Sequence, residues 1–437
     1  MYSCWPTVYR TPSIGNYRAA FTADLIRNTL KLLGYKVKSV MNITDVGHLV
    51  SDADEGEDKL EKWSKREGIS AREVAKKYEA SFKDGMKKLN IDEFDEMPRA
   101  TDHIQEQIDL VKILEEKWYT YKIEDGIYMD TSKVPNYGEL MWPNYKKRLA
   151  DLNAGERIEM GDKKHPTDFA LRKFSPANEQ RQMERDSPRG KGFPGWHIEC
   201  SAMSSKYLGH QFDIHHGGAD HITIHHPNEI AQSECAFDVH PRVKYRIHNE
   251  FLQVDGGKMS KSLWNVYTLA DIEAKWYTIL DLRYFYFMAQ YGSFQNFTRD
   301  QLEAAKNARK SLIKKIQSTT QEDNKEINEA FKQKIEEVLC DNLNTPQILA
   351  EIHTQLNLHG GTIYPYLLDL ENSFLKLWLF EKEEIIEIPT EVKELADQRV
   401  QAKQDKNYAL ADELRNKITA LWREVKDSKD GYELNKL

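Results

Sequence analysis

Residues 191–234 read KGFPGWHIECSAMSSKYLGHQFDIHHGGADHITIHHPNEIAQSE and hold seven of the chain's 14 histidines and one of its 4 cysteines, Cys200. Because proline suits the first turn of a helix, Pro227 predicts a helix start with His225 at its mouth and Glu229 one turn further on. Their side chains can then face one point. Taken singly, Cys200 is better explained as a core residue and each histidine as a surface group. As a cluster they indicate a functional site.

Thiolate, imidazole and carboxylate groups are all zinc ligands. Zinc takes four ligands, or three together with a substrate. Cys200, His225 and Glu229 supply three, so this stretch predicts a zinc site that is completed from elsewhere in the chain or by a substrate.

Composition places broad limits on the protein. With 437 residues, 40% of them hydrophobic and 30% charged, the chain is expected to be soluble and to hold two to four domains. It has neither an apolar run long enough for a membrane span nor a leader pattern, so we expect a cytoplasmic protein without a membrane partner. A net charge of −8 argues against a globally basic nucleic-acid binder but not against a local basic groove.

The 4 cysteines are mostly far apart in sequence and form no disulfide framework. In a cytosolic chain they are expected to be ligands or core residues. Cys235 and Cys340 are assigned to packing.

The chain opens with the pattern of a parallel α/β sheet. A short strand is expected to end near Cys4, an amphipathic helix to run from about Tyr17 to Leu33, and a second strand to cover 36–42. The Gly15-Asn16 step at the helix mouth suits a phosphate, because free backbone N–H groups point there. Alone, this step is better explained as a turn.

The later regions differ in pattern. Residues 51–63 are acidic and expected to form a solvated loop that enters a helix, and 101–190 are rich in aromatic and turn residues. Long charged helices are expected from Thr298 to about Glu381. Residues 386–391 are expected to be a linker, and 391–437 a small unit with one basic-acidic helix.

Seven motifs follow one another along the chain: CWPTVYRTPSIGN (4–16), NITDVGH (42–48), PGWHIECSAM (194–203), GGADHITIHHPNEIAQSE (217–234), GGKMSKSLWN (256–265), DNLNTP (341–346) and RVQAKQDKNYALADELR (399–415). In order and spacing they resemble the motifs of cysteinyl-tRNA synthetases. The resemblance covers nearly the whole chain.

The resemblance implies an α/β fold: a class I Rossmann-type parallel sheet split by a connective insertion, then a helical bundle and a small C-terminal domain. The implied domains are a catalytic domain in two halves (1–100 and 191–240), the insertion (101–190), a KMSKS-loop and stem-contact region (241–298), a helical tRNA-binding bundle (299–390) and an anticodon-binding domain (391–437).

The implied activity is ATP-dependent ligation of L-cysteine to tRNA(Cys) through a cysteinyl-adenylate, by a monomer. Such chemistry needs no enzyme nucleophile, only positioning and stabilisation of phosphate charge. The resemblance places catalysis on Lys258, Lys261, Ser13 and Asn16, with Mg²⁺ accompanying ATP. The expected ATP-binding residues are Gly15, Asn16, Lys258, Met259, Ser260, Lys261 and Ser262.

The resemblance also places one Zn²⁺ per chain on Cys4, Cys200, His225 and Glu229, with the substrate thiolate as an added ligand. A metal favours a thiolate over a hydroxyl, which would separate cysteine from serine without an editing domain. Carried over as neighbours of the amino acid are Thr44, Trp196, His215 and Asp220, of which Asp220 is expected to face the ammonium group. Packing alone would equally explain Thr44 and Trp196.

The chain departs from the family pattern at several places. Ser13 stands where the family has a histidine that helps to hold ATP phosphates, and reduced activity is one expected consequence. Met1 falls almost on the first strand, so the true start codon is expected upstream. Trp5 replaces a glycine beside a zinc ligand, where a bulky side chain is expected to clash or to block the site.

The tryptophan departures are systematic. Trp5 and Trp264 replace family glycines, and six further tryptophans stand where glycine would suit a turn or a helix end: Trp63, Trp118, Trp142, Trp276, Trp378 and Trp422. Arg185 and Arg189 stand where the family has tryptophan, and Arg72, Arg172 and Arg423 are candidates for the same exchange. The hypothesis is a gene from an organism with a reassigned code, translated with the wrong table. A codon shared by these eight tryptophans and Trp196 would exclude it.

Two other functions remain open. A cysteine-activating ligase acting on an amino sugar would share the catalytic motifs, but 391–437 resembles an anticodon-binding region. A non-catalytic paralogue that binds zinc or tRNA is favoured by Ser13 and Trp5 and opposed by the intact 258–262 loop and zinc ligands.

Overall fold

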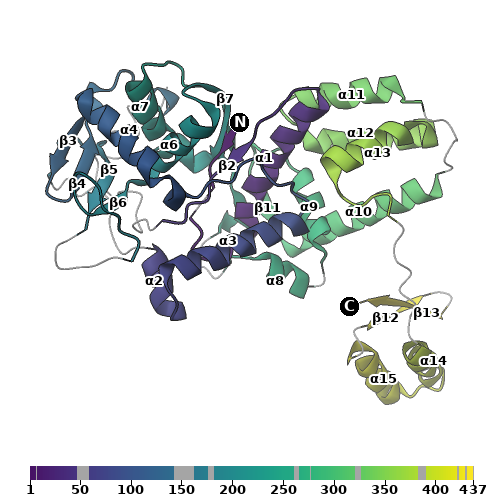
Figure 1. Ribbon diagram of the computed structural model, residues 1–437. Coiled ribbons are helices and arrows are strands. Elements are labelled where there is room, and N and C mark those ends of the chain that lie inside the picture. The colour runs from purple at the N-terminus through teal and green to yellow at the C-terminus, as the bar shows by residue number, and fades with distance from the viewer. Residues whose placement is uncertain are drawn as a thin grey trace. The chain divides into compact units, whose positions relative to one another are not determined.

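The computed structural model describes residues 1–5, 7–46, 59–141, 162–175, 182–259, 265–275, 277–319, 326–381, 390–420, 423–428 and 431–436. The chain divides into two compact units, Met1–Leu379 and Phe380–Leu437. Figure 1 shows the elements of each unit.

The centre of the first unit is a parallel sheet with strand order β2-β1-β7-β8. These strands are β1 (Tyr2–Ser3), β2 (Val40–Met41), β7 (Phe212–Gly218) and β8 (Val243–Asn249). Every neighbouring pair is parallel, and β1 lies between strands that are far from each other in sequence. The expected α/β class with a parallel sheet is confirmed.

Helix α1 (Ile14–Leu32) connects β1 to β2. It begins three residues before the predicted start at Tyr17, because Ser13 accepts a hydrogen bond from the Asn16 N–H while the Asn16 side chain accepts one from the Ser13 N–H. The expected strand over 36–42 is shorter than predicted and pairs in the ladder only at β2.

A second, antiparallel sheet is inserted between β2 and β7. Its strands, in order, are β3 (Thr120–Ile123), β4 (Gly126–Met129), β5 (Phe169–Phe174) and β6 (Gly192–Pro194). Three helices precede it: α2 (Lys59–Glu67), α3 (Ala71–Lys88) and α4 (Ile104–Glu116). The connective insertion predicted to split the parallel sheet is therefore present.

The inserted sheet shares one core with α4 and with the helices on either side of β7 in sequence. Helices α6 (Trp196–Leu208) and α7 (His225–Phe237) pack with α4 against β4 and β5 (Figure 1). Their buried contact residues include Leu110, Leu114, Ile127, Leu171, Ile198 and Ala231. This packing fixes α6 and α7 beside the end of β7.

After β8 the chain forms a small three-stranded sheet, β10-β9-β11, with β9 (Leu252–Val254), β10 (Gly257–Lys258) and β11 (Gln295–Phe297). The β9–β10 turn uses Asp255 and Gly256 with φ of 49° and 77°, the Asp-Gly pattern of a tight hairpin. Helices α8 (Leu269–Ala274) and α9 (Ile279–Phe287) lie between β10 and β11 in sequence.

The remainder of the first unit is helical, as predicted for residues 298–381. Its helices are α10 (Arg299–Ser318), α11 (Glu329–Cys340), α12 (Thr345–His359) and α13 (Tyr364–Leu370), followed by a π-turn at Glu371–Leu375. Buried Arg283 of α9 donates hydrogen bonds to the carbonyls of Leu89 and Leu375, which ties this helical part to the loop after α3. Short 3-10 turns occur at Ala100–His103, Thr131–Lys133, Glu139–Met141, Ala219–Ile222 and Gly360–Ile363.

The second unit contains α14 (Thr390–Gln404), α15 (Tyr408–Ala420) and the hairpin β12 (Arg423–Ser428) and β13 (Gly431–Lys436). The prediction of a single helix here is wrong. Lys406 adopts φ of 57°, which ends α14, and the Asn407 side chain accepts a hydrogen bond from the Leu410 N–H at the start of α15. Within the described residues, no helix is both long and apolar enough to cross a membrane.

Candidate active site

The candidate site lies where β1 and β7 meet α6 and α7. Cys4 directly follows β1, and its N–H donates to the His216 carbonyl of β7 at 3.0 Å, so the thiol is held at the sheet. Cys200 lies on α6. His225 begins α7 with Glu229 four residues later, as the prediction of a helix start near Pro227 required.

The four predicted zinc ligands converge. The Cys4 Sγ atom is 3.6 Å from the Cys200 Sγ and 3.5 Å from the Glu229 Oε1, and the His225 Nε2 is 2.9 Å from the same Oε1. All four donor atoms lie within 4.8 Å of one another, and all four residues are buried. Around a tetrahedral zinc ion with bonds of about 2.0–2.3 Å, donor atoms lie roughly 3.3–3.8 Å apart. The two Cys4 distances fall in this range, and the His225–Glu229 ion pair is slightly closer.

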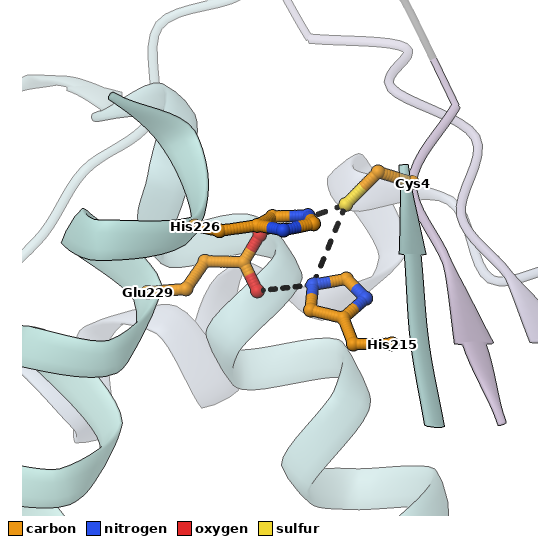
Figure 2. Close-up of side chains that lie close together, drawn as sticks. All are labelled: Cys4, His215, His226 and Glu229. Atoms are coloured by element: carbon orange, nitrogen blue, oxygen red, sulfur yellow. Dashed lines mark hydrogen bonds and ion pairs between the residues drawn. The ribbon is translucent and has the colours of Figure 1, made fainter. Parts of the chain in front are cut away.

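A second group shares two of these residues. Cys4, His215, His226 and Glu229 also offer donor atoms within 4.8 Å of one another. Figure 2 shows the four side chains converging from β1, β7 and α7. The His215 Nε2 is 2.8 Å from the Glu229 Oε2, and its ring stacks on that of His226 at 4.1 Å. The sequence analysis predicted His215 as a site residue but missed His226. The available signal was its position beside His225 and three residues before Glu229, on the same face of the expected helix.

The electrostatics favour ionised Glu229 and Cys200, whereas burial, with Cys200 and Glu229 nearby, raises the pKa of Cys4 well above its usual value. Burial alone would raise the pKa of Glu229, but His215 and His225 outweigh it and hold that pKa well below its usual value. The hydrogen bond from Cys4, together with His225, lowers the pKa of Cys200 to about 6, although burial opposes it. Burial also works against a charged His225, yet Glu229 and Cys200 raise its pKa to about 10. A zinc ion at this position would replace the His225 proton as the positive charge that offsets Glu229 and the Cys200 thiolate.

The predicted neighbours of the amino acid lie around this cluster. Trp196 begins α6, and its ring centroid lies 5.2 Å from that of His225. Thr44 is buried beyond the end of β2. Asp220 is exposed in the short turn after β7, with its Oδ2 4.0 Å from the His221 Nε2.

Gly217 allows the histidine rings to approach the strand. A Cβ atom at Gly217 would lie 2.4 Å from the His221 Nδ1 and 3.0 Å from the His226 Nε2. Any larger residue would therefore push the rings away from the sheet end.

The predicted ATP residues are partly brought together. Ser13 caps α1, and a Cβ atom at Gly15 would lie 3.5 Å from the Met259 Cε, so the helix mouth and the start of the 258–262 loop adjoin. The Asn16 side chain accepts from Ser13 and so belongs to the cap. Ser260, Lys261 and Ser262 lie outside the described residues, and Lys258 is described only as part of β10.

The expected clash at Trp5 is wrong, and the alternative expectation, that Trp5 blocks the site, stays a prediction. The indole ring is buried and stacks on Phe82 of α3 with a centroid distance of 3.7 Å and an interplanar angle of 21°. The Trp5 N–H donates to the Asn42 Oδ1 at 2.9 Å, so the backbone beside Cys4 keeps a regular hydrogen bond.

Comparison with known proteins assigns the class. Residues 1–307 match the model of the tRNA synthetases class I (C) catalytic domain. A solved structure of Mycobacterium tuberculosis methionyl-tRNA synthetase in complex with methionyl-adenylate shares the fold, with a TM-score of 0.56 and 13% identity over 87% of this chain and 88% of that one. The fold and the family match define a class I tRNA synthetase.

More similar relatives are the cysteine--tRNA ligase 1 of Burkholderia lata, 42% identical over 99% of this chain and 92% of the relative, and the cysteine--tRNA ligase of Treponema denticola, 39% identical over 96% and 92%. The cysteine--tRNA ligase of Bacteroides thetaiotaomicron is 38% identical over 100% of this chain and 94% of its own length. The chain belongs to the cysteine--tRNA ligase family.

Proposed function

We propose that this chain ligates L-cysteine to tRNA(Cys), using ATP and passing through a cysteinyl-adenylate. The observation that carries the proposal is the buried group of two thiols, an imidazole and a carboxylate beside the sheet end. In a class I tRNA synthetase fold, ligands bind outside the carboxyl ends of the parallel strands, which is where this group lies.

The residues present fit a zinc ion. Cys4, Cys200, His225 and Glu229 offer two sulfur, one nitrogen and one oxygen donor at suitable separations. Bound there, zinc would supply a Lewis acid that holds a thiolate much better than a hydroxyl at neutral pH. The proposed ligand set would thereby favour cysteine over serine.

The other proposed roles belong to side chains around this group. The exposed Asp220 carboxylate is the proposed partner of the substrate ammonium group. Trp196 and His215 would border the amino acid, and buried Thr44 would present its hydroxyl. These contacts would orient the substrate carboxylate toward the α-phosphate of ATP.

ATP is proposed to bind at the mouth of α1, with its phosphates accompanied by Mg²⁺. The Asn16 N–H is used by the Ser13 cap, which leaves the Gly15 N–H of the first turn for a phosphate, and the helix dipole favours negative charge there. Lys258 and Lys261 are the proposed cations for the departing pyrophosphate. Ser13 supports this mouth as the helix cap.

The transfer of cysteine to tRNA(Cys) tests the proposal. Purified protein is incubated with labelled cysteine, ATP and a tRNA(Cys) transcript, and cysteinyl-tRNA is separated on acid gels. ATP-dependent charging of tRNA(Cys), and not of a serine tRNA transcript, is expected. Labelling of an amino sugar instead would assign the chain to amino-sugar ligation. Zinc binding without cysteine activation would indicate a non-catalytic paralogue.

A further inference from the structure

Asn42 occupies a central place next to the candidate site. It lies directly after β2, is completely buried, and uses both ends of its side-chain amide. Its Oδ1 accepts the Trp5 N–H at 2.9 Å, and its Nδ2 lies 3.3 Å from the Trp5 carbonyl oxygen. The amide thus holds both polar backbone groups of the residue that follows Cys4.

The same amide also reaches Thr44. Its Nδ2 donates to the Thr44 Oγ1 at 2.9 Å. The amide orientation follows from this network, since the Trp5 N–H can be satisfied only by the oxygen. Because the Thr44 oxygen already accepts a hydrogen bond, its own hydrogen is left to donate elsewhere, and Thr44 interacts with the buried carboxylate of Glu199, which precedes Cys200.

We infer that Asn42 is a positioning residue for cysteine recognition: it fixes the backbone beside Cys4 and orients the Thr44 hydroxyl with one amide group. This inference rests on the proposed function. Neither role requires Asn42 to touch the substrate. Residues that orient ligands in this way affect metal affinity by about 10- to 100-fold when they are replaced.

Trp5 is held at both its ring and its backbone. The ring stacks on Phe82 of α3, and the backbone N–H and carbonyl contact the Asn42 amide. Loss of the amide would leave both buried backbone groups without these partners and the segment beside Cys4 held through the indole ring.

The test compares two substitutions that remove different contacts of Asn42. Asn42→Ala removes the hydrogen bonds to the Trp5 backbone and to the Thr44 hydroxyl. Thr44→Val removes only the hydroxyl and leaves the Trp5 contacts. Zinc affinity is measured by chelator competition, and the thiolate-to-metal absorption of the Co²⁺-substituted protein reports the cysteine ligands. KM values for cysteine and ATP come from pyrophosphate exchange.

Asn42→Ala is expected to weaken zinc binding by about 10-fold or more and to reduce the Co²⁺–thiolate absorption. It should also raise the KM for cysteine more than the KM for ATP. Thr44→Val should raise only the KM for cysteine, and Thr44→Ser, which keeps the hydroxyl, should return this KM to its original value. The double variant Asn42→Ala/Thr44→Val should have a KM for cysteine no higher than that of Asn42→Ala. Asn42→Asp, which keeps the volume and the acceptor but loses the donated bonds, should also raise the KM for cysteine.

Gln295→Ala is the matched control. Gln295 lies on β11, in a different sheet, and its buried side-chain amide donates a hydrogen bond to the Phe285 carbonyl. It should lower the melting temperature without changing zinc affinity or the Co²⁺ absorption. The inference is overturned if Asn42→Ala behaves like this control, or if the effects of Asn42→Ala and Thr44→Val on the KM for cysteine add independently. Failure of the unsubstituted protein to bind zinc or activate cysteine would instead overturn the proposed function.

Discussion

Trp118 and Trp378 adopt left-handed backbone conformations, with φ of 64° and 58°. Both side chains are largely exposed, at 79% and 51%. Trp118 directly follows the last residues of α4; its N–H bonds to the Glu115 carbonyl and the next N–H bonds to the Leu114 carbonyl. This is the helix-ending pattern in which glycine is the usual residue, because a Cβ atom is disfavoured there.

Replacement of these tryptophans by glycine should stabilise the protein. The left-handed conformation costs a residue with a side chain roughly 1–2 kcal/mol, which glycine avoids. The greater freedom of glycine in the unfolded chain offsets about half of this gain in folding free energy. Trp118→Gly and Trp378→Gly should each add about 0.5–1 kcal/mol to the free energy of unfolding, measured by urea denaturation. Trp118→Ala keeps the Cβ atom and serves as the control; an equal gain in that variant would show that backbone strain is not the cause.

Two of the arginines at expected tryptophan positions, Arg172 and Arg189, lie at one cavity. Arg172 of β5 is buried, its guanidinium donates to the carbonyl oxygens of Arg185 and Gly190, and burial lowers its pKa. With Arg189 it lines a cavity of about 240 Å³ whose walls include Val111, Ile127 and Leu171. The wall also carries Lys112, and Arg189 pairs with Glu115 at 2.9 Å, so both arginines find polar partners at this cavity. Peptide mass spectrometry of the protein from its natural source would identify residues 118 and 172 directly.

At the scale of elements, the start of α1 has two roles: its Ser13 cap stabilises the helix, and its first turn is the proposed ATP site. Ser13→Ala removes the cap and should lower the free energy of unfolding by about 1 kcal/mol. If the α1 mouth binds phosphates, the same change should raise the KM for ATP in pyrophosphate exchange. Ser70 caps α3 by the same reciprocal pattern, with Glu73. Ser70→Ala should lose similar stability at an unchanged KM for ATP, and an equal rise in KM in both variants would contradict a local role for the α1 mouth.

Much of the element order was predictable because local chemistry sets it. The strand–helix–strand opening, the insertion and the helical stretch after Thr298 all follow from periodicity and from the family resemblance. The cap at Ser13 was missed because Ser13 was considered only as a phosphate ligand. The break at Lys406 was missed because a charged stretch without glycine or proline gives little sign of a left-handed residue.

At the scale of the whole molecule, residues 380–437 form a unit with its own buried residues, which include Val392, Ala396, Ile418 and Val425. If this unit binds tRNA, as the family resemblance implies for 391–437, its removal should leave cysteine-dependent pyrophosphate exchange largely intact. Charging of tRNA(Cys) at limiting tRNA should fall at least about tenfold, which corresponds to about 1.4 kcal/mol of lost binding. Equal loss of both activities would mean that the unit supports the catalytic part instead.

The candidate site shows where sequence reasoning ends. The resemblance named Cys4, Cys200, His225 and Glu229, and the fold brings them together from positions up to 225 residues apart. The second group of donors, which adds His215 and His226, and the Asn42 network depend on packing between β1, β2, β7 and α7, which no local pattern records.

Cysteine-dependent ATP–pyrophosphate exchange, with serine as the competing substrate and before and after zinc removal by a chelator, tests the central claim most directly. We predict exchange with cysteine and little with serine, loss of exchange on chelation, and recovery when one equivalent of Zn²⁺ per chain is restored. Exchange that survives complete zinc removal with cysteine still preferred would contradict zinc-based selection. Absence of exchange in the zinc-loaded protein would contradict the proposed ligation itself.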